Sequence, residues 1–332
     1  MKTYNIPVFV PHRGCPFDCV FCNQKRITGT ACEVTPNDVR ETIEKYLRTL
    51  PNDGCVIETA FFGGSFTGIP MYEQSALLNA AKPFKDSGKI SGIRLSTRPD
   101  YINKEILDNL LKYGVTTIEL GVQSMSDDVL KASNRGHSAD TVREAVRLIR
   151  EYPFKLGLQM MTGLPSDTPE KSIYTASELI RLKPDFVRIY PTLVIRDTYL
   201  EEMYKRGEYK PQTVDGAAEL CKTLLLMFQD AGITVIRIGL QPTDEICENG
   251  SVVAGPVHSA FGEVTESKIY LDLIRKQLKS GDRAKVFVNP SEISKAVGNK
   301  RSNVLILKKE NIEIKVIGDE KLRKREVRCV CC

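Results

Sequence analysis

The chain lacks the features of a membrane, secreted or fibrous protein. No run of about 18 apolar residues occurs among its 332 residues, which argues against a spanning helix. The first residues contain no apolar signal core, so we expect a cytoplasmic protein. Short-period repeats and low-complexity segments are also missing. The composition, with 42% hydrophobic and 27% charged residues, is that of a globular protein.

Ten cysteines are present, and they occur without a secretion signal. Disulfide-stabilised folds belong to oxidising compartments, so a disulfide framework is not expected here. The cysteines instead indicate a reducing compartment, in which thiols bind metal or take part in chemistry.

The positive charge is concentrated near the C-terminal end. The chain has a net charge of +5. Residues 281–332, with 13 basic and 7 acidic side chains, carry +6, whereas residues 1–280 carry −1. Such asymmetry indicates either a nucleic-acid or phosphate partner, or a well-solvated small domain. The segment KLRKREVR (321–328) has no interleaved aromatic residue and leaves both interpretations open.

Near-continuous apolar runs alternate with amphipathic segments along most of the chain. This alternation predicts parallel strands that are buried on both faces, connected by helices. Strands are expected at 6–11, 58–64, 92–97, 117–122, 155–161, 186–191 and 234–240. Helices are expected at 39–50, 73–84, 104–114, 141–152, 170–182 and 216–232. The predicted fold is α/β, a partial (β/α)6-type TIM barrel with a small C-terminal α/β appendix.

The pattern changes near residue 280. Strands are expected at 284–290, 303–309 and 312–318, around a short helix at 291–298. The predicted domains are a barrel with a cluster-binding loop (1–280), a basic α/β appendix (281–328) and a cysteine-rich tail (329–332). Cys329, Cys331 and Cys332 either bind a second metal or lie in an unstructured tail.

The motif HRGCPFDCVFC contains Cys15, Cys19 and Cys22 with the spacing C-x3-C-x2-C. Three thiolates so close together can bind three irons of a [4Fe-4S] cluster, which leaves the fourth iron open to a small chelating molecule. A zinc site lacks a fourth ligand at normal spacing. Three unrelated cysteines, or an iron–sulfur protein without catalytic activity, are the remaining alternatives.

This motif, placed directly after a first strand, resembles that of the radical S-adenosylmethionine (SAM) superfamily. The resemblance implies that the open iron chelates the amino and carboxylate groups of SAM. An electron from the cluster then cleaves SAM to methionine and a 5′-deoxyadenosyl radical, which removes hydrogen from the substrate. An electron donor of the flavodoxin or ferredoxin type is also implied.

The resemblance further implies a set of SAM-binding residues. A glycine turn after the second strand would hold the SAM amino group by its backbone, and four polar residues would contact the ribose and the methionine carboxylate. All lie near the carboxyl ends of predicted strands, where barrel sites are built. They are Gly63, Gly64, Ser65, Ser96, Gln123, Arg135 and Gln159. For the two glutamines a buried structural amide, and for Arg135 a surface position, remain alternatives.

Longer segments resemble the radical SAM domain of the Elongator catalytic subunit and its stand-alone bacterial relatives. They are STRPDYI, GVQSMSDDVLKASNRGH, MTGLPSDT and VRIYPTLVIRDTYLEEMYKRGEYKP, and the similarity spans residues 5–240. Those relatives have a longer spacing between their first two cluster cysteines and a glutamate where this chain has Ser96. They also carry an acetyltransferase domain, for which no segment here is long enough.

These departures favour a small-molecule substrate. Among the stand-alone proteins of this kind that the chain resembles, one activity is that of a queuine lyase, so the resemblance implies cleavage of the modified base queuine with release of a 7-deazaguanine that carries an aminomethyl group. The alternative keeps an intact tRNA base as the substrate, with the basic appendix as a docking surface. No membrane partner is expected.

Three residues after the sixth strand are candidates for substrate contact, namely Tyr190, Thr192 and Arg196. By position they face the barrel mouth, although Tyr190 can equally serve packing.

Two further residues are catalytic candidates beside Tyr190. Glu119 lies inside the fourth strand, where an ion pair with Arg94, Arg188 or Arg237 is the default and recognition of a guanine-like edge is the alternative. His258 can act as a general base, although a capping or core histidine is more common.

Overall fold

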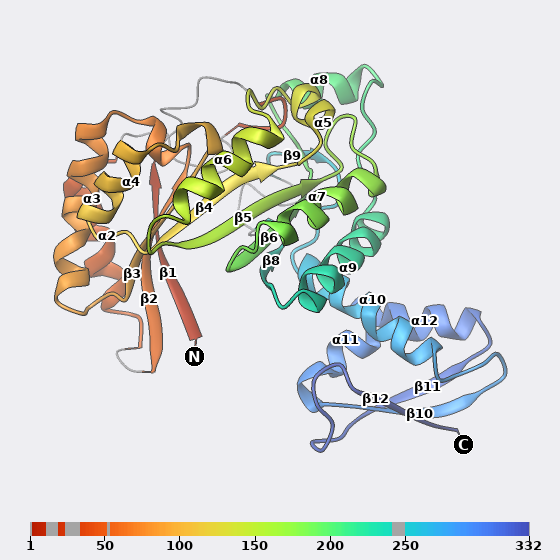
Figure 1. Cartoon of the computed structure of the whole chain (residues 1–332). Helices are drawn as coiled ribbons and strands as arrows, with labels where there is room; N and C mark the ends of the chain where they lie inside the picture. The colour runs from red at the N-terminus through yellow and green to blue at the C-terminus, as the bar shows by residue number, and fades with distance from the viewer. Residues whose placement is uncertain (1, 11–18, 24–33, 52–53, 241–249, 332) are drawn as a thin grey trace. The chain divides into compact units, whose positions relative to one another are not determined.

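The structure is a computed structural model that describes residues 2–10, 19–23, 34–51, 54–240 and 250–331. The chain forms two compact units, residues 1–212 with 227–257 and residues 213–226 with 258–332 (Figure 1). Within the described ranges, no helix combines the length and the apolar character needed to cross a membrane.

The described part of the first unit is built on a parallel sheet of seven strands, in the order β1-β2-β3-β4-β5-β6-β8. All seven expected strands are confirmed. Their bounds are β1 Lys2–Val10, β2 Cys55–Gly63, β3 Gly92–Thr97, β4 Thr117–Gln123, β5 Lys155–Thr162, β6 Phe186–Pro191 and β8 Thr234–Ile238. The sheet curls into a partial TIM barrel, as the sequence predicts (Figure 1).

Helices connect successive strands, and all six expected helices are present. They are α2 Pro36–Leu47, α3 Met71–Asp86, α4 Lys104–Lys112, α6 Ala139–Ile149, α7 Pro169–Arg181 and α9 Val214–Asp230. Additional short elements are α5 Asp127–Ala132, α8 Tyr199–Lys205, the 3-10 turns η1 Phe66–Gly68 and η2 Pro99–Tyr101, and an antiparallel pair, β7 Val194–Ile195 with β9 Val252–Ala254.

Side-chain alternation gives the sheet two different faces. On β3 and β4 the fully buried Leu95, Ile118 and Leu120 alternate with the buried polar residues Arg94 and Glu119. Because successive strand residues point to opposite faces, one face of the sheet is apolar and the other carries charged groups. All strands run in parallel, so their carboxyl ends meet at one edge, which is where a barrel of this type builds its site.

The second unit contains a three-stranded sheet in the order β11-β10-β12, with β10 parallel to β11 and antiparallel to β12. Its elements are α10 Phe261–Arg275, β10 Arg283–Val288, η3 Pro290–Glu292, α11 Ile293–Val297, η4 Asn299–Arg301, α12 Ser302–Lys309, β11 Glu313–Gly318 and β12 Val327–Cys331. Its core joins the helices to one face of the sheet, through Tyr270, Ile274, Val286, Val288, Ala296 and Leu307 among others.

Two predictions for this region are wrong. The segment 303–309 is helical, because Asn303 and Leu307 are buried one turn apart and the Asn303 amide donates to the carbonyls of Ser267 and Ala296 (2.9 and 3.1 Å). The second unit also extends beyond the predicted 281–328: it includes residues 213–226 and 258–280, because α10 supplies part of its core.

The cysteine-rich end is a strand, whereas an unstructured tail was the simpler expectation. Cys329 and Cys331 lie in β12, paired with Val286 and Ala284 of β10, and Cys329 packs against the core of the second unit. Cys332 lies outside the described residues. The described part of the chain contains no group of three His, Cys, Asp or Glu side chains arranged to hold a metal.

Burial gives the two cysteines of β12 different reactivity. Burial, followed by the neighbouring Cys331, raises the pKa of the Cys329 thiol to about 11, whereas Cys331 is exposed. Because the thiolate is the reactive form, Cys329 is expected to react at least about tenfold more slowly than Cys331 with iodoacetamide at pH 8. Timed alkylation of the folded protein and peptide fragmentation check this. Equal rates would show that Cys329 is accessible.

Candidate functional site

A small cavity of about 130 Å³ lies at the carboxyl edge of the sheet. It is lined by two cysteines of the motif, Cys19 and Cys22. All seven predicted SAM-binding residues line it as well, namely Gly63, Gly64, Ser65, Ser96, Gln123, Arg135 and Gln159. Cys15 lies outside the described residues. The structure therefore brings together residues that are up to 140 positions apart in the sequence.

The glycine turn after β2 approaches the end of β1 closely. Gly63 has a φ of +113°, and a Cβ atom on it would lie 2.3 Å from the Val10 carbonyl oxygen. The Gly64 N–H donates to that same oxygen (3.2 Å). Only glycine fits this backbone, so the turn places main-chain groups, and no side chain, at the cavity wall.

A chain of hydroxyl groups fixes the residues that follow the turn. Ser65 Oγ lies 2.8 Å from Thr97 Oγ1, and Thr97 Oγ1 lies 2.5 Å from Thr67 Oγ1. The Arg98 N–H donates to Ser65 Oγ (3.2 Å). These buried contacts connect the segment after β2 with the end of β3 at the cavity wall.

Arg135 connects the cysteine motif to the sheet. Its Nη1 donates to Cys19 Sγ (3.3 Å) and its Nη2 donates to the Gly121 carbonyl of β4 (2.6 Å). The Val20 N–H next to Cys19 donates to the Ser133 carbonyl (3.2 Å). Arg135 is only 6% exposed, so the alternative of an ordinary surface arginine is wrong.

Glu119 is held in a buried network of charges, which confirms the default expectation of an ion pair. Arg188 Nε donates to Glu119 Oε2 (2.7 Å) and Arg94 Nη1 donates to Glu119 Oε1 (2.9 Å). A second carboxylate, Glu58, pairs with Arg94 (2.5 Å). Because both carboxylate oxygens accept from arginines and the side chain is fully buried, Glu119 is positioned by structure and does not face the cavity.

Gln159 connects this network to the cavity. Its Nε2 donates to Glu119 Oε2 (3.0 Å) and lies 3.5 Å from Ser96 Oγ. A carboxylate only accepts hydrogen bonds, so the amide must present its NH2 group to Glu119. This fixes the direction of the Gln159 amide at the cavity wall.

The other candidates are not brought to this cavity. Thr192 is buried, and its hydroxyl donates to the Thr162 carbonyl (2.7 Å). Arg196 is exposed in the loop after β7 and does not line the cavity. The Tyr190 hydroxyl accepts from Arg188 (3.4 Å), and burial raises the pKa of Tyr190, so its phenol stays protonated. None of these three residues therefore lines the small cavity.

His258 belongs to the second unit. Its Nδ1 accepts from the N–H of Ala260, the residue that caps α10 (3.0 Å), and its Nε2 lies 2.7 Å from Asn299 Nδ2. Both ring nitrogens are therefore used inside this unit. The alternative of a capping histidine is confirmed, and the structure gives no support to a general base.

Four residues of the cavity wall were missed by the sequence reasoning, namely Phe21, Thr97, Arg98 and Gly121. Arg98 forms an ion pair with Asp100 (2.8 Å) and donates to the Arg135 carbonyl (2.5 Å). Its place directly after a predicted strand was the available signal, because the same argument found its neighbour Ser96.

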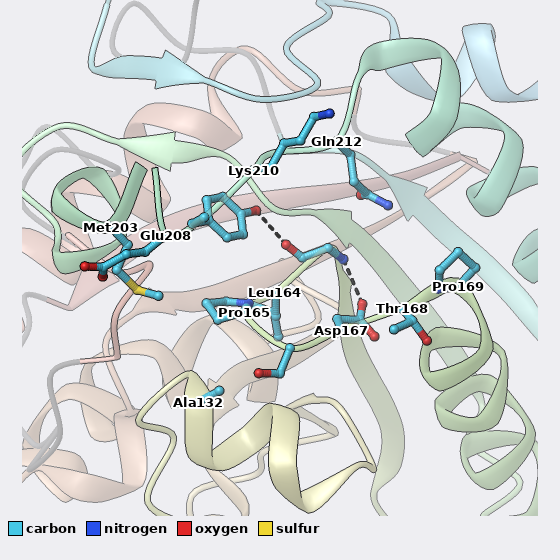
Figure 2. A pocket seen from close by; sticks show the side chains of 13 residues that line it. Ala132, Leu164, Pro165, Asp167, Thr168, Pro169, Met203, Glu208, Lys210 and Gln212 are labelled. Atoms are coloured by element: carbon cyan, nitrogen blue, oxygen red, sulfur yellow. Dashed lines mark hydrogen bonds between the residues drawn. The ribbon is translucent and has the colours of Figure 1, made fainter. Parts of the chain in front are cut away.

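A second and larger cavity, of about 690 Å³, lies in the first unit beside the turn between β5 and α7 (Figure 2). The Tyr209 hydroxyl donates to the Gly163 carbonyl (2.6 Å), and the Gly163 N–H donates to Asp167 (2.8 Å). Burial raises the pKa of the Asp167 carboxyl. The wall of this larger cavity includes Ala132. The next residue in the chain is Ser133, whose carbonyl accepts the hydrogen bond from the Val20 N–H beside Cys19. Residues of the segment 132–135 therefore line both cavities, Ala132 the larger one and Arg135 the smaller one.

The residues of the small cavity fit a [4Fe-4S] cluster with bound SAM. Cysteine thiolates are the preferred ligands of iron–sulfur clusters, and Cys19 and Cys22 line the cavity opposite a glycine cradle. Two buried polar atoms, Gln123 Oε1 and Arg135 Nε, have no hydrogen-bond partner among the described residues. Buried polar atoms are normally paired, so these two indicate a polar ligand in the cavity.

Comparison with known proteins agrees with this geometry. The chain matches the family model "Radical SAM superfamily" over residues 9–179, slightly more than half of its length, and the "Radical_SAM C-terminal domain" over residues 184–271. The solved structure of the archaeal Methanocaldococcus infernus Elp3 superposes with a TM-score of 0.63 at 26% identity, covering 84% of this chain and 65% of that chain.

Curated relatives match a shorter region. "Elongator complex protein 3" of Schizosaccharomyces pombe is 33% identical over 201 residues, 54% of this chain and 37% of that protein. "tRNA uridine(34) acetyltransferase" of Methanocaldococcus infernus is 37% identical over 155 residues, 44% of this chain and 28% of that protein. The chain therefore spans about a third of the length of these relatives. By its family match and its cavity, the chain belongs to the radical SAM superfamily of enzymes, whose cofactors are a [4Fe-4S] cluster and SAM.

Proposed function

We propose that this radical SAM enzyme modifies a base of a tRNA. The observation that carries the proposal is the cavity that joins Cys19 and Cys22 to the glycine turn and the polar residues at the carboxyl edge of the barrel. The choice of tRNA rests on the relatives, which are named Elongator complex protein 3 and tRNA uridine(34) acetyltransferase. Because the matches cover only part of those proteins, acetyl transfer is not included in the proposal.

We assign the predicted roles as follows. Cys15, Cys19 and Cys22 would bind the cluster, and the backbone of the glycine turn would hold the amino end of SAM. Polar contacts to SAM would come from Ser96, Gln123, Arg135 and Gln159. When bound, the cluster supplies an electron and SAM supplies the group that abstracts hydrogen. The protein's own contribution is orientation, because the hydroxyl chain and the Glu119 network hold these side chains in one arrangement.

The substrate base would enter the larger cavity. It combines apolar side chains, such as Leu164 and Met203, with polar groups from Tyr209 and Gln212, a mixture typical of sites for ring-shaped ligands (Figure 2). Its wall adjoins the segment that contacts Cys19, so a base bound there lies next to the cofactor cavity.

Cleavage of queuine stays a prediction without support among the relatives. In that reaction Glu119 was expected to read a guanine-like edge, but two arginines occupy its carboxylate. A flavodoxin or ferredoxin as electron donor also stays a prediction.

The test compares the two substrate classes directly. Anaerobically reconstituted, dithionite-reduced protein is incubated with SAM and either bulk tRNA or queuine. The proposal predicts that tRNA increases the yield of 5′-deoxyadenosine and gains a modified base detectable by nucleoside mass spectrometry. Stimulation by queuine alone would overturn it in favour of the small-molecule reaction.

The contact of Arg135 with Cys19 predicts an effect on the cluster itself. Because a hydrogen bond to a ligating sulfur stabilises the more negative, reduced cluster, Arg135→Gln is expected to lower the reduction potential, on the order of tens of millivolts. Redox titration followed by electron paramagnetic resonance, without SAM, measures this. Arg147→Gln, an exposed arginine of α6, is the control and should leave the potential unchanged.

A further inference from the structure

Within the described residues of the second unit, the helices pack on one face of its sheet and leave the other face uncovered by this unit. On the central strand β10, Ala284, Val286 and Val288 point into the core with the helices. Strand alternation therefore sends Arg283, Lys285 and Phe287 to the other side. The side chains of Arg283 and Lys285 are exposed, and that of Phe287 is half-buried.

The neighbouring strands β11 and β12 add further basic and apolar side chains to the same face of the sheet. Lys315 of β11 pairs with Lys285 in the register, and Arg328 and Val330 of β12 pair with Phe287 and Lys285. We call this surface the open sheet face; it comprises Arg283, Lys285 and Phe287 of β10, Glu313, Lys315 and Ile317 of β11, and Arg328 and Val330 of β12.

Two lysines on the open sheet face are placed against each other. Lys285 and Lys315 are opposite each other on parallel strands, and both are exposed. Like charges in directly opposed positions are destabilising. Neither lysine side chain has an ion pair or a hydrogen bond to another described residue, whereas Arg283 and Arg328 are paired with Glu313 (3.0 Å) and Asp319 (2.8 Å). The repulsion is not relieved inside the described chain, and an anionic ligand would relieve it.

An aromatic side chain lies next to these charges. The guanidinium of Arg328 lies 4.7 Å from the centre of the Phe287 ring, over its face. A flat sheet that combines an aromatic ring and a guanidinium plane with nearby lysines is the arrangement that stacks unpaired bases while the cations contact phosphates. The basic segment 321–328 contains no aromatic residue in the sequence. In the structure, strand pairing places Phe287 beside Arg328, the last residue of this segment.

We infer that the open sheet face binds single-stranded RNA, with phosphates on Lys285 and Lys315 and a base stacked on the Phe287–Arg328 pair. If the RNA is the loop of a tRNA, the inference rests on the proposed function; the binding of RNA itself does not. The chemistry favours RNA over an acidic protein or a lipid surface. Those partners would pair with the lysines, but they have no base that can stack on the Phe287 ring and the Arg328 guanidinium.

The test measures binding of the full-length protein to tRNA and to a single-stranded RNA oligonucleotide by fluorescence anisotropy. The double variant Lys285→Gln/Lys315→Gln is expected to bind about tenfold more weakly at 0.1 M salt, and its plot of log affinity against log salt should be shallower by about 1. Lys308→Gln/Lys309→Gln removes the same charge from exposed lysines of α12, whose Leu307 packs on the other face of the sheet, and should bind like the wild type.

Phe287→Leu separates stacking from charge. It is expected to lose at least about fivefold in affinity for the oligonucleotide with no change in salt slope. Thermal unfolding of each variant confirms that the second unit is intact. Equal loss in both double variants, no RNA binding by the wild type, or binding only to vesicles of phosphatidylglycerol would overturn the inference.

The two proposals fail in different measurements. If the Lys285/Lys315 variant binds tRNA like the wild type while tRNA still increases 5′-deoxyadenosine formation, the open sheet face is wrong and the proposed function stands. If the open sheet face binds RNA but tRNA leaves 5′-deoxyadenosine formation unchanged, the proposed function is wrong and the RNA surface stands.

Discussion

Replacing Glu119 with alanine is expected to lower the free energy of unfolding by about 3–5 kcal/mol. The substitution leaves Arg94 and Arg188 buried, at 7% and 8% exposure, without the carboxylate that both contact. Glu58 still pairs with Arg94, but Arg188 loses its carboxylate partner and keeps the long contact to the Tyr190 hydroxyl (3.4 Å) and its position over the Phe62 ring. An uncompensated buried charge is far more costly than the loss of an exposed ion pair.

Urea unfolding of the protein measures this, and Glu144→Ala is the control. Glu144 also pairs with an arginine, Arg147 (2.7 Å), but both side chains are more than half exposed. Its removal should leave stability unchanged within error. The variant Glu119→Gln keeps the shape and removes the charge, so it should fall between the two. Wild-type stability in Glu119→Ala would show that the buried network is not required for folding.

Gly63→Ala is expected to destabilise the protein by at least about 2 kcal/mol and to weaken SAM binding at least about tenfold. The added Cβ would lie 2.3 Å from the Val10 carbonyl oxygen, a backbone atom that cannot rotate away. The φ of +113° is also strained for any residue with a side chain. The turn must therefore move, and the cavity wall moves with it.

Gly88→Ala is the control that distinguishes the effect of a positive φ from the effect of the close contact with the Val10 carbonyl oxygen. Gly88 also has a positive φ, +73°, but a Cβ there would have no atom within 4 Å. Its substitution should cost only about 1 kcal/mol and leave SAM affinity unchanged. Affinity is measured by equilibrium binding of radiolabelled SAM to the reconstituted protein. If both variants lose affinity equally, the glycine turn is not part of the SAM site.

The sequence was sufficient for the strands of the barrel, and the cysteine motif and the family resemblance together identified nine of the thirteen residues that line the cavity. Hydrophobic runs located the seven parallel strands, because strands buried on both faces leave a near-continuous apolar pattern. The family resemblance identified Ser96 and Gln159, and both line the cavity, because parallel strands end at the same edge. The cysteine motif directly follows the first predicted strand, and this position was sufficient to place Cys19 and Cys22 at the carboxyl edge of the sheet.

The sequence was less informative where tertiary contacts override local pattern. The apolar run at 303–309 suits a strand, but the buried Asn303 amide, which donates to two helices, fixes it as a helix. Thr192 follows a strand as the cavity residues do, yet its hydroxyl donates to the Thr162 carbonyl. Gln123 reaches the cavity only because its backbone adopts a φ of +69° at a register shift in β4, which no spacing rule predicts.

The most direct test of the cluster and its open iron is electron paramagnetic resonance of the anaerobically reconstituted, dithionite-reduced protein, recorded before and after addition of SAM. The account predicts about four irons per chain, a reduced-cluster signal, and a change in that signal when SAM binds. Loss of the signal in Cys19→Ser would identify a ligand. Protein that retains no iron, or a cluster signal that SAM leaves unchanged, would contradict the account.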